Sequence, residues 1–215
     1  MKTGPYPCAN RIALLLLLAW FMATSACSLL PARQHNKNTG AYYFELLQPA
    51  QLGDNIGLVQ HFTFEHGDRR QTLLIQSEVH AHGLAMVAST LSCATLFTLT
   101  MEQGRHALQG ELPLQPDASS RIDPKHILTD FQLTYWPKNH LSKALENSSY
   151  QLIDGDGYRQ LRTGDSLVVD IRYSRAERWL ADIEFHHYPR KYHYRVRTLQ
   201  HYDPDVPIAA SETIL

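Results

Sequence analysis

The sequence predicts a mainly β domain of the α+β class, a curved antiparallel sheet or incomplete barrel with a two-helix lid. Apolar and polar residues alternate over most of residues 41–215, and short turn-forming segments separate the alternating stretches. A single interval near residue 130 has helical spacing instead. About nine or ten strands are expected, and a sheet of that size tends to curl.

Residues 1–26 are expected to be a lipoprotein signal peptide. The apolar run 12–23 follows the cations Lys2 and Arg11 and is shorter than the roughly 20 residues that span a membrane. Small residues then lead to Cys27, and this order resembles a bacterial lipobox, in which the cysteine is acylated. Thr24 stands where that pattern prefers leucine. Cleavage by the general signal peptidase and an uncleaved anchor are the alternatives.

Residues 27–40 are polar, contain Pro31 and Gly40, and have neither helical nor strand periodicity, so they are interpreted as a tether. If the resemblance to a lipoprotein holds, Ser28 after the acylated cysteine favours the outer membrane. The single domain would then comprise residues 41–215.

The strands are expected where apolar residues recur at every second position. This alternation marks 73–79, 167–173, 179–186 and 192–197. Further strands are expected at 57–65, 84–89, 94–101 and 105–112. Glycine-containing turns separate them, among them Asp154-Gly155-Asp156-Gly157. That turn resembles the start of a calcium loop but lacks the downstream acidic ligand, so a hairpin is expected.

Two helices are expected between the strand groups. Asp123-Pro124 is typical of a helix start, and Ile127, Leu128, Phe131 and Tyr135 follow at helical spacing until Pro137 interrupts. A second helix is expected over 138–145. Together they are predicted to lie across the concave face of the sheet.

The charge and cysteine content exclude some classes of function. The net charge is −1, from 20 basic and 21 acidic residues, so nothing favours a nucleic-acid partner. Cys93 is the one cysteine inside the expected domain, and no Lys or Arg adjoins it to activate the thiol. We expect Cys93 to be a small buried residue.

No catalytic residue, metal site or cofactor is expected. His80 and His82 beside Glu78, and His186 and His187 with His193, suggest metal ligands by type. Zinc needs three or four converging ligands, so solvated histidines at sheet edges are the favoured interpretation. The sequence has no zincin, nucleophile-elbow, Walker or dinucleotide motif. An enzyme with a cryptic site is the least favoured class.

The chain resembles a family of small Gram-negative lipoproteins of unknown function, often encoded beside aryl polyene biosynthesis genes. The resemblance rests on the lipobox cysteine, the strands at 84–89 and 94–99, the helix from Asp123 to the segment 133–137, and the strands around Tyr173 and Tyr194. It covers about residues 57–199, and Cys93 replaces the family's glycine. This architecture is similar in turn to that of the periplasmic lipoprotein carrier and its outer-membrane receptor, which implies a half-barrel with an apolar cavity.

The leading hypothesis is an outer-membrane lipoprotein that faces the periplasm and binds or passes on a lipid-like molecule, possibly a lipoprotein or an aryl polyene lipid, without catalysis. Envelope transport proteins are its possible partners. The alternative is a structural or assembly lipoprotein that docks an envelope protein, with a solid core. For the first hypothesis Cys27 is the lipid attachment site, and the expected ligand-binding residues share inward apolar positions: Leu84, Met86, Phe97, Leu99, Trp136, Ile171 and Ile183. Trp136, Trp179, Tyr192 and Tyr194 can stack on a ligand, although aromatic residues on strands belong first to a core.

Overall fold

Ten antiparallel strands form one continuous sheet, seen in a computed structural model that describes residues 44–102, 105–110 and 124–205. The strands are β1 (Ile56–His66), β2 (Arg69–His80), β3 (Gly83–Ser89), β4 (Thr95–Glu102), β5 (Arg105–Gly110), β6 (Tyr150–Gly155), β7 (Tyr158–Thr163), β8 (Ser166–Tyr173), β9 (Ile183–His187) and β10 (Tyr192–Tyr202). All lie in the unit Gly40–Leu215. The expected signal peptide, tether and Cys27 lie outside the described residues.

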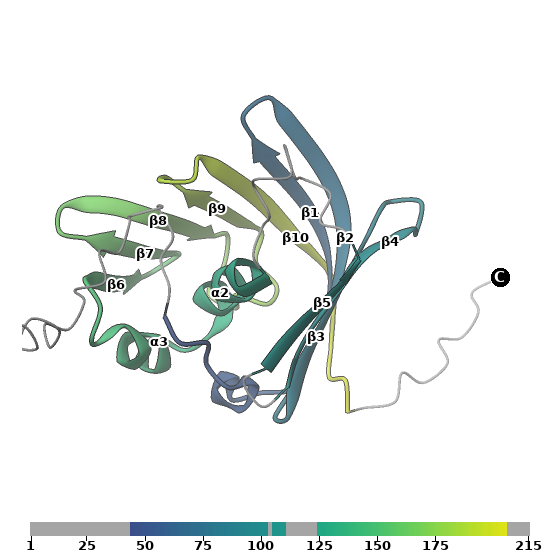
Figure 1. Cartoon of the computed structure of the whole chain (residues 1–215), viewed down its shortest axis with the longest axis horizontal. Coiled ribbons are helices and arrows are strands. Elements are labelled where there is room, and N and C mark those ends of the chain that lie inside the picture. The colour runs from purple at the N-terminus through teal and green to yellow at the C-terminus, as the bar shows by residue number, and fades with distance from the viewer. Residues whose placement is uncertain (1–43, 103–104, 111–123, 206–215) are drawn as a thin grey trace, which may run out of the picture. The chain divides into compact units, whose positions relative to one another are not determined.

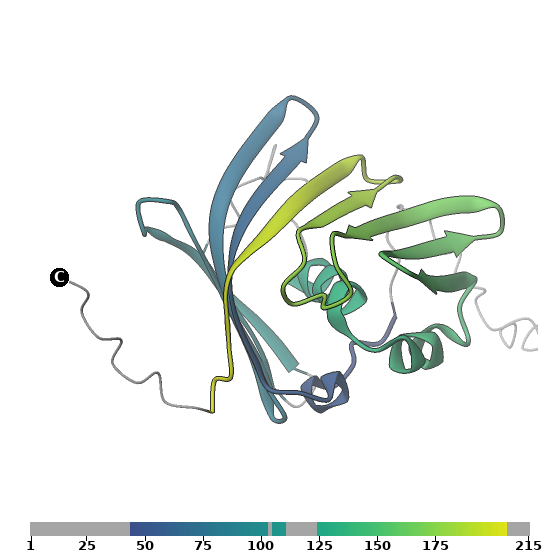
Figure 2. The same ribbon diagram turned by 180° about the vertical axis from the view of Figure 1, so that it is seen from behind.

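The sheet consists of two meanders joined by the first and last strands. Its order is β5-β4-β3-β2-β1-β10-β9-β8-β7-β6, so β1 and β10 pair at its centre (Figures 1 and 2). In that pairing Phe62 lies opposite Val196 and Phe64 lies opposite Tyr194. The antiparallel sheet that the alternation predicts is therefore confirmed.

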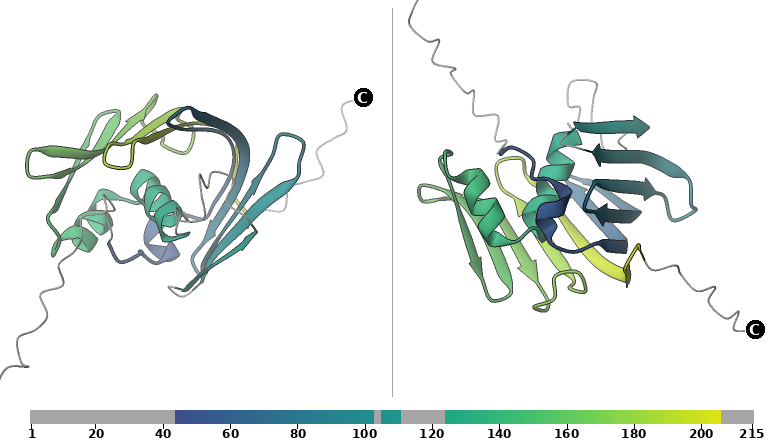
Figure 3. Two further views of the ribbon diagram at one scale, coloured as in Figure 1. Left: turned by 45° about the horizontal axis from the view of Figure 1, so that its top comes forward. Right: turned by 90° about the horizontal axis from the view of Figure 1, so that it is seen from below.

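The sheet is strongly curved rather than flat. The register shifts at Val59/Gln60, at Ala88/Ser89 and at Leu161/Arg162, and such bulges bend a strand and increase its twist. Figure 3 shows the sheet arching over the helices, with an open side between β5 and β6. This is the open, curved form of the expected half-barrel.

Two α-helices and a short 3-10 helix lie on the concave side of the sheet (Figure 3). They are η1 (Pro49–Leu52), α2 (Pro124–Tyr135) and α3 (Lys138–Leu145). Pro137 separates α2 from α3 because its ring prevents the helix from continuing. Both expected helices are confirmed, while Asp123 falls outside the described residues. Within the part of the chain that is described, every helix is too short or too polar to cross a bilayer.

The core lies between the concave face and these helices. Inward side chains at every second strand position are buried, as in Leu84, Met86 and Ala88 of β3. Their neighbours Ala85, Val87 and Ser89 lie on the opposite face and are less buried. The alternation works because successive side chains of a strand point to opposite faces.

Three sequence expectations differ from the structure. Residues 179–182 precede β9 in tight turns, because the amides of Leu180 and Ala181 donate to the carbonyls of Glu177 and Arg178. Cys93 is exposed in the β3–β4 turn, not buried, and has a φ of 64°. That left-handed conformation is one that favours glycine. Strand β10 also continues to Tyr202, beyond the expected end at 197.

Candidate functional site

The seven residues predicted to bind a ligand all lie in the core under the concave face. Each is between 0% and 4% exposed, and they come from β3, β4, β8, β9 and the junction that follows α2. Leu84, Met86, Phe97, Leu99, Trp136, Ile171 and Ile183 belong to one hydrophobic cluster. Strands β2, β1 and β10 separate the β3–β4 group from the β8–β9 group. The structure therefore brings the seven residues into one core that extends on both sides of the central β1–β10 pair.

Aromatic rings line the middle of the concavity. The ring of Tyr194 stacks on that of Phe185 at 4.4 Å between centroids and lies 4.5 Å from that of Phe62. Tyr192 stacks on Phe64 at 5.4 Å. Both tyrosines are thus part of the core, the role that sequence favours for aromatic residues on strands.

A second aromatic run belongs to α2 and the segment that follows β8. Trp179 stacks on Tyr135 at 5.1 Å, and Tyr135 lies 4.9 Å from Phe131. Phe131 in turn contacts the ring of Trp136 edge-on at 5.9 Å. This run leads from the partly buried Trp179 to the fully buried Trp136.

Helix α2 buries an unusual number of polar side chains against the sheet: His126, Thr129, Asp130, Gln132 and Thr134. The two threonine hydroxyls donate to carbonyls one turn back, at 2.6 and 2.7 Å. Gln132 accepts from the amide of Leu47 at 2.9 Å and donates to the carbonyl of Leu47 at 2.8 Å. These bonds satisfy groups that burial would otherwise make costly.

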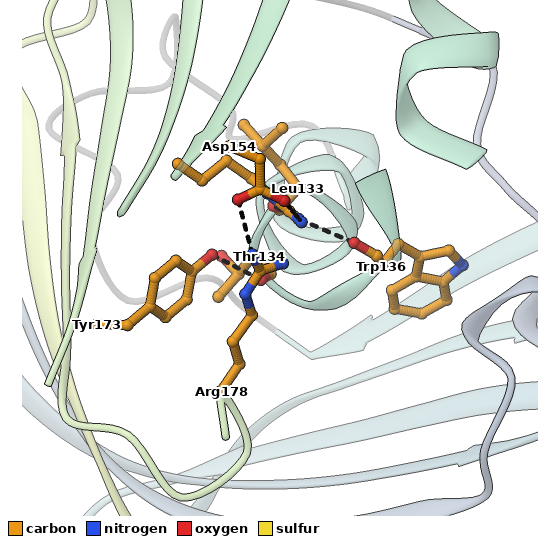
Figure 4. A network of polar contacts seen from close by, with 7 residues as sticks. Leu133, Thr134, Trp136, Asp154, Tyr173 and Arg178 are labelled. Atoms are coloured by element: carbon orange, nitrogen blue, oxygen red, sulfur yellow. Dashed lines mark hydrogen bonds and ion pairs between the residues drawn. The ribbon is translucent and has the colours of Figure 1, made fainter. Parts of the chain in front are cut away.

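The C-terminal end of α2 is held by a buried arginine on β7 (Figure 4). Arg159 is 0% exposed, and its Nη1 donates to the carbonyls of Leu133 and Trp136 at 2.7 and 2.9 Å. The hydroxyl of Tyr173 donates to the carbonyl of Thr134 at 2.8 Å. A cation and a hydroxyl thus satisfy carbonyls at the helix end, where the helix dipole is negative.

Asp154 joins two arginines beside this helix end. Its Oδ2 accepts from Arg159 Nη2 at 2.8 Å, and its Oδ1 accepts from Arg178 Nη2 at 2.7 Å (Figure 4). Burial alone would raise the pKa of Asp154, but the hydrogen bonds and charges of the two arginines hold it below its usual value. Burial raises the pKa of Tyr173 to about 12. Asp154 is therefore ionised and Tyr173 protonated at neutral pH.

The N-terminal part of α2 is held by residues of β9, β10 and their turn. Arg190 contacts His126, and the hydroxyl of Tyr192 donates to Asp130. His187 lies beside them and is 1% exposed. Burial, and then the charges of Arg190 and His126, lower the pKa of His187 to about 3. The ring is thus neutral at physiological pH.

The histidines considered as metal ligands lie in separate places. His80, the last residue of β2, lies 3.3 Å from Asp205 and 4.0 Å from Glu78. His193 Nε2 lies 2.7 Å from a carboxylate oxygen of Glu65, and the ring of His193 stacks on that of His186 at 5.2 Å. His186, His187 and His193 lie on interior strands and not at a sheet edge, because β9 and β10 are paired on both sides. In the described ranges, no three His, Cys, Asp or Glu side chains are grouped so that they could hold a metal ion.

Sequence reasoning did not identify the two polar anchors of α2. One signal for Arg159 was present: it shares strand parity with the buried Leu161, so it had to point inward. The same signal marks His187, which shares strand parity with the buried Ile183 and Phe185. No such signal marks Asp130, because its partner Tyr192 comes from an element distant in the chain.

Comparison with known proteins gives a family and a similar structure. The crystal structure of a LolA superfamily protein from Nitrosomonas europaea is similar with a TM-score of 0.38 and 12% sequence identity, over 77% of this chain and 96% of that one. The search of curated proteins finds no match. The family model matches residues 57–200, close to the range on which the sequence resemblance rests. The chain therefore belongs to the family described as Protein of unknown function (DUF3261).

Proposed function

We propose that this protein binds a lipid-like hydrophobic molecule on the concave face of its sheet and passes it on during transport in the cell envelope, without catalysis. The observation that carries the proposal is an apolar concave face covered by a helix that buries polar residues. Six apolar residues from the strands of both meanders and Trp136 after α2 belong to one buried cluster there, and α2 packs into the same cluster. Because polar contacts fix α2, we infer that the helix can move away and a ligand can bind to the apolar surface in its place.

The energetics favour such a replacement. Two groups of polar contacts, Arg159 with Tyr173 at one end and Arg190 with Tyr192 at the other, fix α2. Water can compensate these contacts when α2 moves away, because a hydrogen bond contributes only about 1 kcal/mol net. An apolar chain of about 400 Å² that takes the helix's place gains on the order of 10 kcal/mol, from which the lost apolar contacts of α2 and the entropy of association must be subtracted.

We further propose that Cys27 carries the lipid anchor and that the protein resides in the outer membrane, facing the periplasm. The cation, apolar run, small residues and cysteine at 2–27 motivate this. Several acyl chains are needed for stable attachment, since a single chain binds membranes only marginally. Fractionation of cells that express Cys27→Ser tests it: the variant should leave the membrane fraction or accumulate unprocessed. A variant that is processed and membrane-bound like the wild type would refute the anchor.

Displacement of an environment-sensitive fluorescent fatty acid by lipid extract tests the ligand. Phe97→Asp should abolish the signal because it places a charge among buried apolar residues. The matched control is Leu199→Asp, which adds the same charge at a position that is 56% exposed. Variants are compared only where circular dichroism shows a cooperative melt, and lipid mass spectrometry of the purified protein identifies the bound species.

The second candidate is a structural or assembly role, in which the protein docks an envelope protein. The extent of burial favours it: all seven predicted ligand-binding residues are at most 4% exposed, as expected of a solid core. Equal fluorescence of the bound fatty acid in wild type and in a folded Phe97→Asp variant would favour the structural or assembly role over ligand binding.

A further inference from the structure

A small polar pocket lies beside the end of α2, outside the apolar core. It has a volume of about 130 Å³ and is formed by the β6–β7 turn and the segment that follows β8. Its lining comprises Gly155, Asp156, Gly157, Tyr173, Arg175, Ala176 and Arg178. Two of these side chains are guanidinium groups, which are suited to binding an oxyanion.

Arg178 is held in place with donors to spare. Its Nη2 donates to Asp154 at 2.7 Å (Figure 4). Its guanidinium carbon also lies over the ring of Tyr173, 4.8 Å from the centroid. The side chain is 23% exposed. Within the described residues, no hydrogen bond occupies Nη1 or Nε of Arg178. A fixed, partly exposed guanidinium with free N–H groups is a preorganised anion ligand.

The local charge also favours an anion. Asp154 is shared between Arg159 and Arg178, so these three side chains carry a net charge of +1. Arg175 and Asp156 are both exposed and add one charge of each sign to the lining. Solvent screens these two charges alike, so the partly exposed Arg178 is the cation that favours an anion here.

An apolar path begins at the next residue. Trp179 follows Arg178 directly and stacks on Tyr135, whose ring leads through Phe131 to the buried Trp136. The cationic pocket is therefore adjacent in the chain to Trp179, the partly buried end of the aromatic run. This juxtaposition matches a molecule with a charged head and an apolar chain.

We propose that the Arg175–Arg178 pocket binds the oxyanion head group, a carboxylate or phosphate, of an amphiphile whose apolar chain enters the core beside Trp179 and Tyr135. This inference rests on the proposed function and adds the chemical class of the ligand's head. Arg178 makes the main contact with the head, and Arg175 adds a second, more mobile cation. The aromatic run accepts the first part of the chain.

The test compares laurate with dodecanol, which has the same chain length but a neutral head, by calorimetric titration of the purified full chain. Wild type should bind laurate about tenfold or more tightly than dodecanol, since a hydrogen bond to a charged group contributes at least that factor. The variants Arg178→Gln and Arg175→Gln should each reduce this preference and together abolish it, with dodecanol affinity unchanged. Arg195→Gln, on an exposed ion pair with Glu184, is the control and should keep the preference.

The outcomes separate this inference from the proposed function. Equal affinity for laurate and dodecanol, or a preference that survives both substitutions, overturns the head-group site while chain binding stands. Binding of neither molecule refutes the proposed function and the inference with it. If acetate or inorganic phosphate displaces laurate at equal concentration, the pocket is a site for small free anions, and the proposal that it binds the head group of an amphiphile is refuted. Arg175→Gln keeps the test valid if Arg178→Gln fails to fold, because Arg175 is exposed.

Discussion

Replacing Arg159 by methionine should destabilise the protein more than any other single change to a charged residue of β7. Methionine keeps most of the buried volume but removes the donors to Leu133, Trp136 and Asp154. A buried acceptor left without its donor costs about 1–3 kcal/mol, and a broken buried ion pair about 3–5 kcal/mol. Arg178 still pairs with Asp154, so the expected loss is about 4 kcal/mol.

Urea unfolding followed by circular dichroism measures this loss. A decrease of that size corresponds to a drop in Tm of roughly 8–16 °C for a domain of this length. Arg162→Met is the matched control, because Arg162 lies on the same strand and bonds only an exposed carbonyl; it should stay within about 0.5 kcal/mol of wild type. If Arg159→Met lost less than about 1 kcal/mol, the inference that Arg159 anchors α2 would be refuted.

Three further substitutions probe other parts of the domain. Trp136→Ala should cost about 3–5 kcal/mol in thermal melts, because the indole is 0% exposed; a small cost with reduced ligand retention would instead identify a cavity wall. The lowered pKa of His187 keeps the folded ring neutral, whereas the unfolded ring takes a proton below about pH 6.5. Stability should therefore fall from about pH 6.5 towards 3, by at most about 1.4 kcal/mol per pH unit, and His187→Gln should flatten that slope in urea titrations; an unchanged slope would contradict it. Cys93→Gly should stabilise the protein by up to about 1 kcal/mol, because the φ of 64° suits glycine, and a destabilised variant would argue against this.

The sequence was sufficient for the parts of the fold that depend on local patterns. Alternation in β8 and β10 predicted both the strands and their inward faces, since the period of two follows directly from strand geometry. Pro137 predicted the break between α2 and α3 for a similarly local reason. The seven expected ligand-binding residues were all placed inward correctly, and whether they contact a ligand stays a prediction.

Features that depend on distant contacts could not be predicted in the same way. Residues 179–182 alternate like a strand, yet turn hydrogen bonds hold this segment, and the ring of Trp179 stacks on Tyr135 of the distant α2. The pairing of Asp130 with Tyr192 and of Arg159 with the end of α2 joins elements that the sequence does not relate. Cys93 seemed buried because it precedes an apolar strand, but the turn geometry places it outside.

The pairing of β1 with β10 determines when folding can finish. Gly57 lies opposite Tyr202, so the central ladder joins residues separated by most of the described chain. During synthesis the β1–β5 meander emerges first, and the inner edge of β1 has no neighbour until β10 has been made. An unpaired edge strand is a template for aggregation, so a nascent chain needs either a chaperone or rapid completion. Such long-range closure also predicts folding on the slow scale of sheets with high contact order.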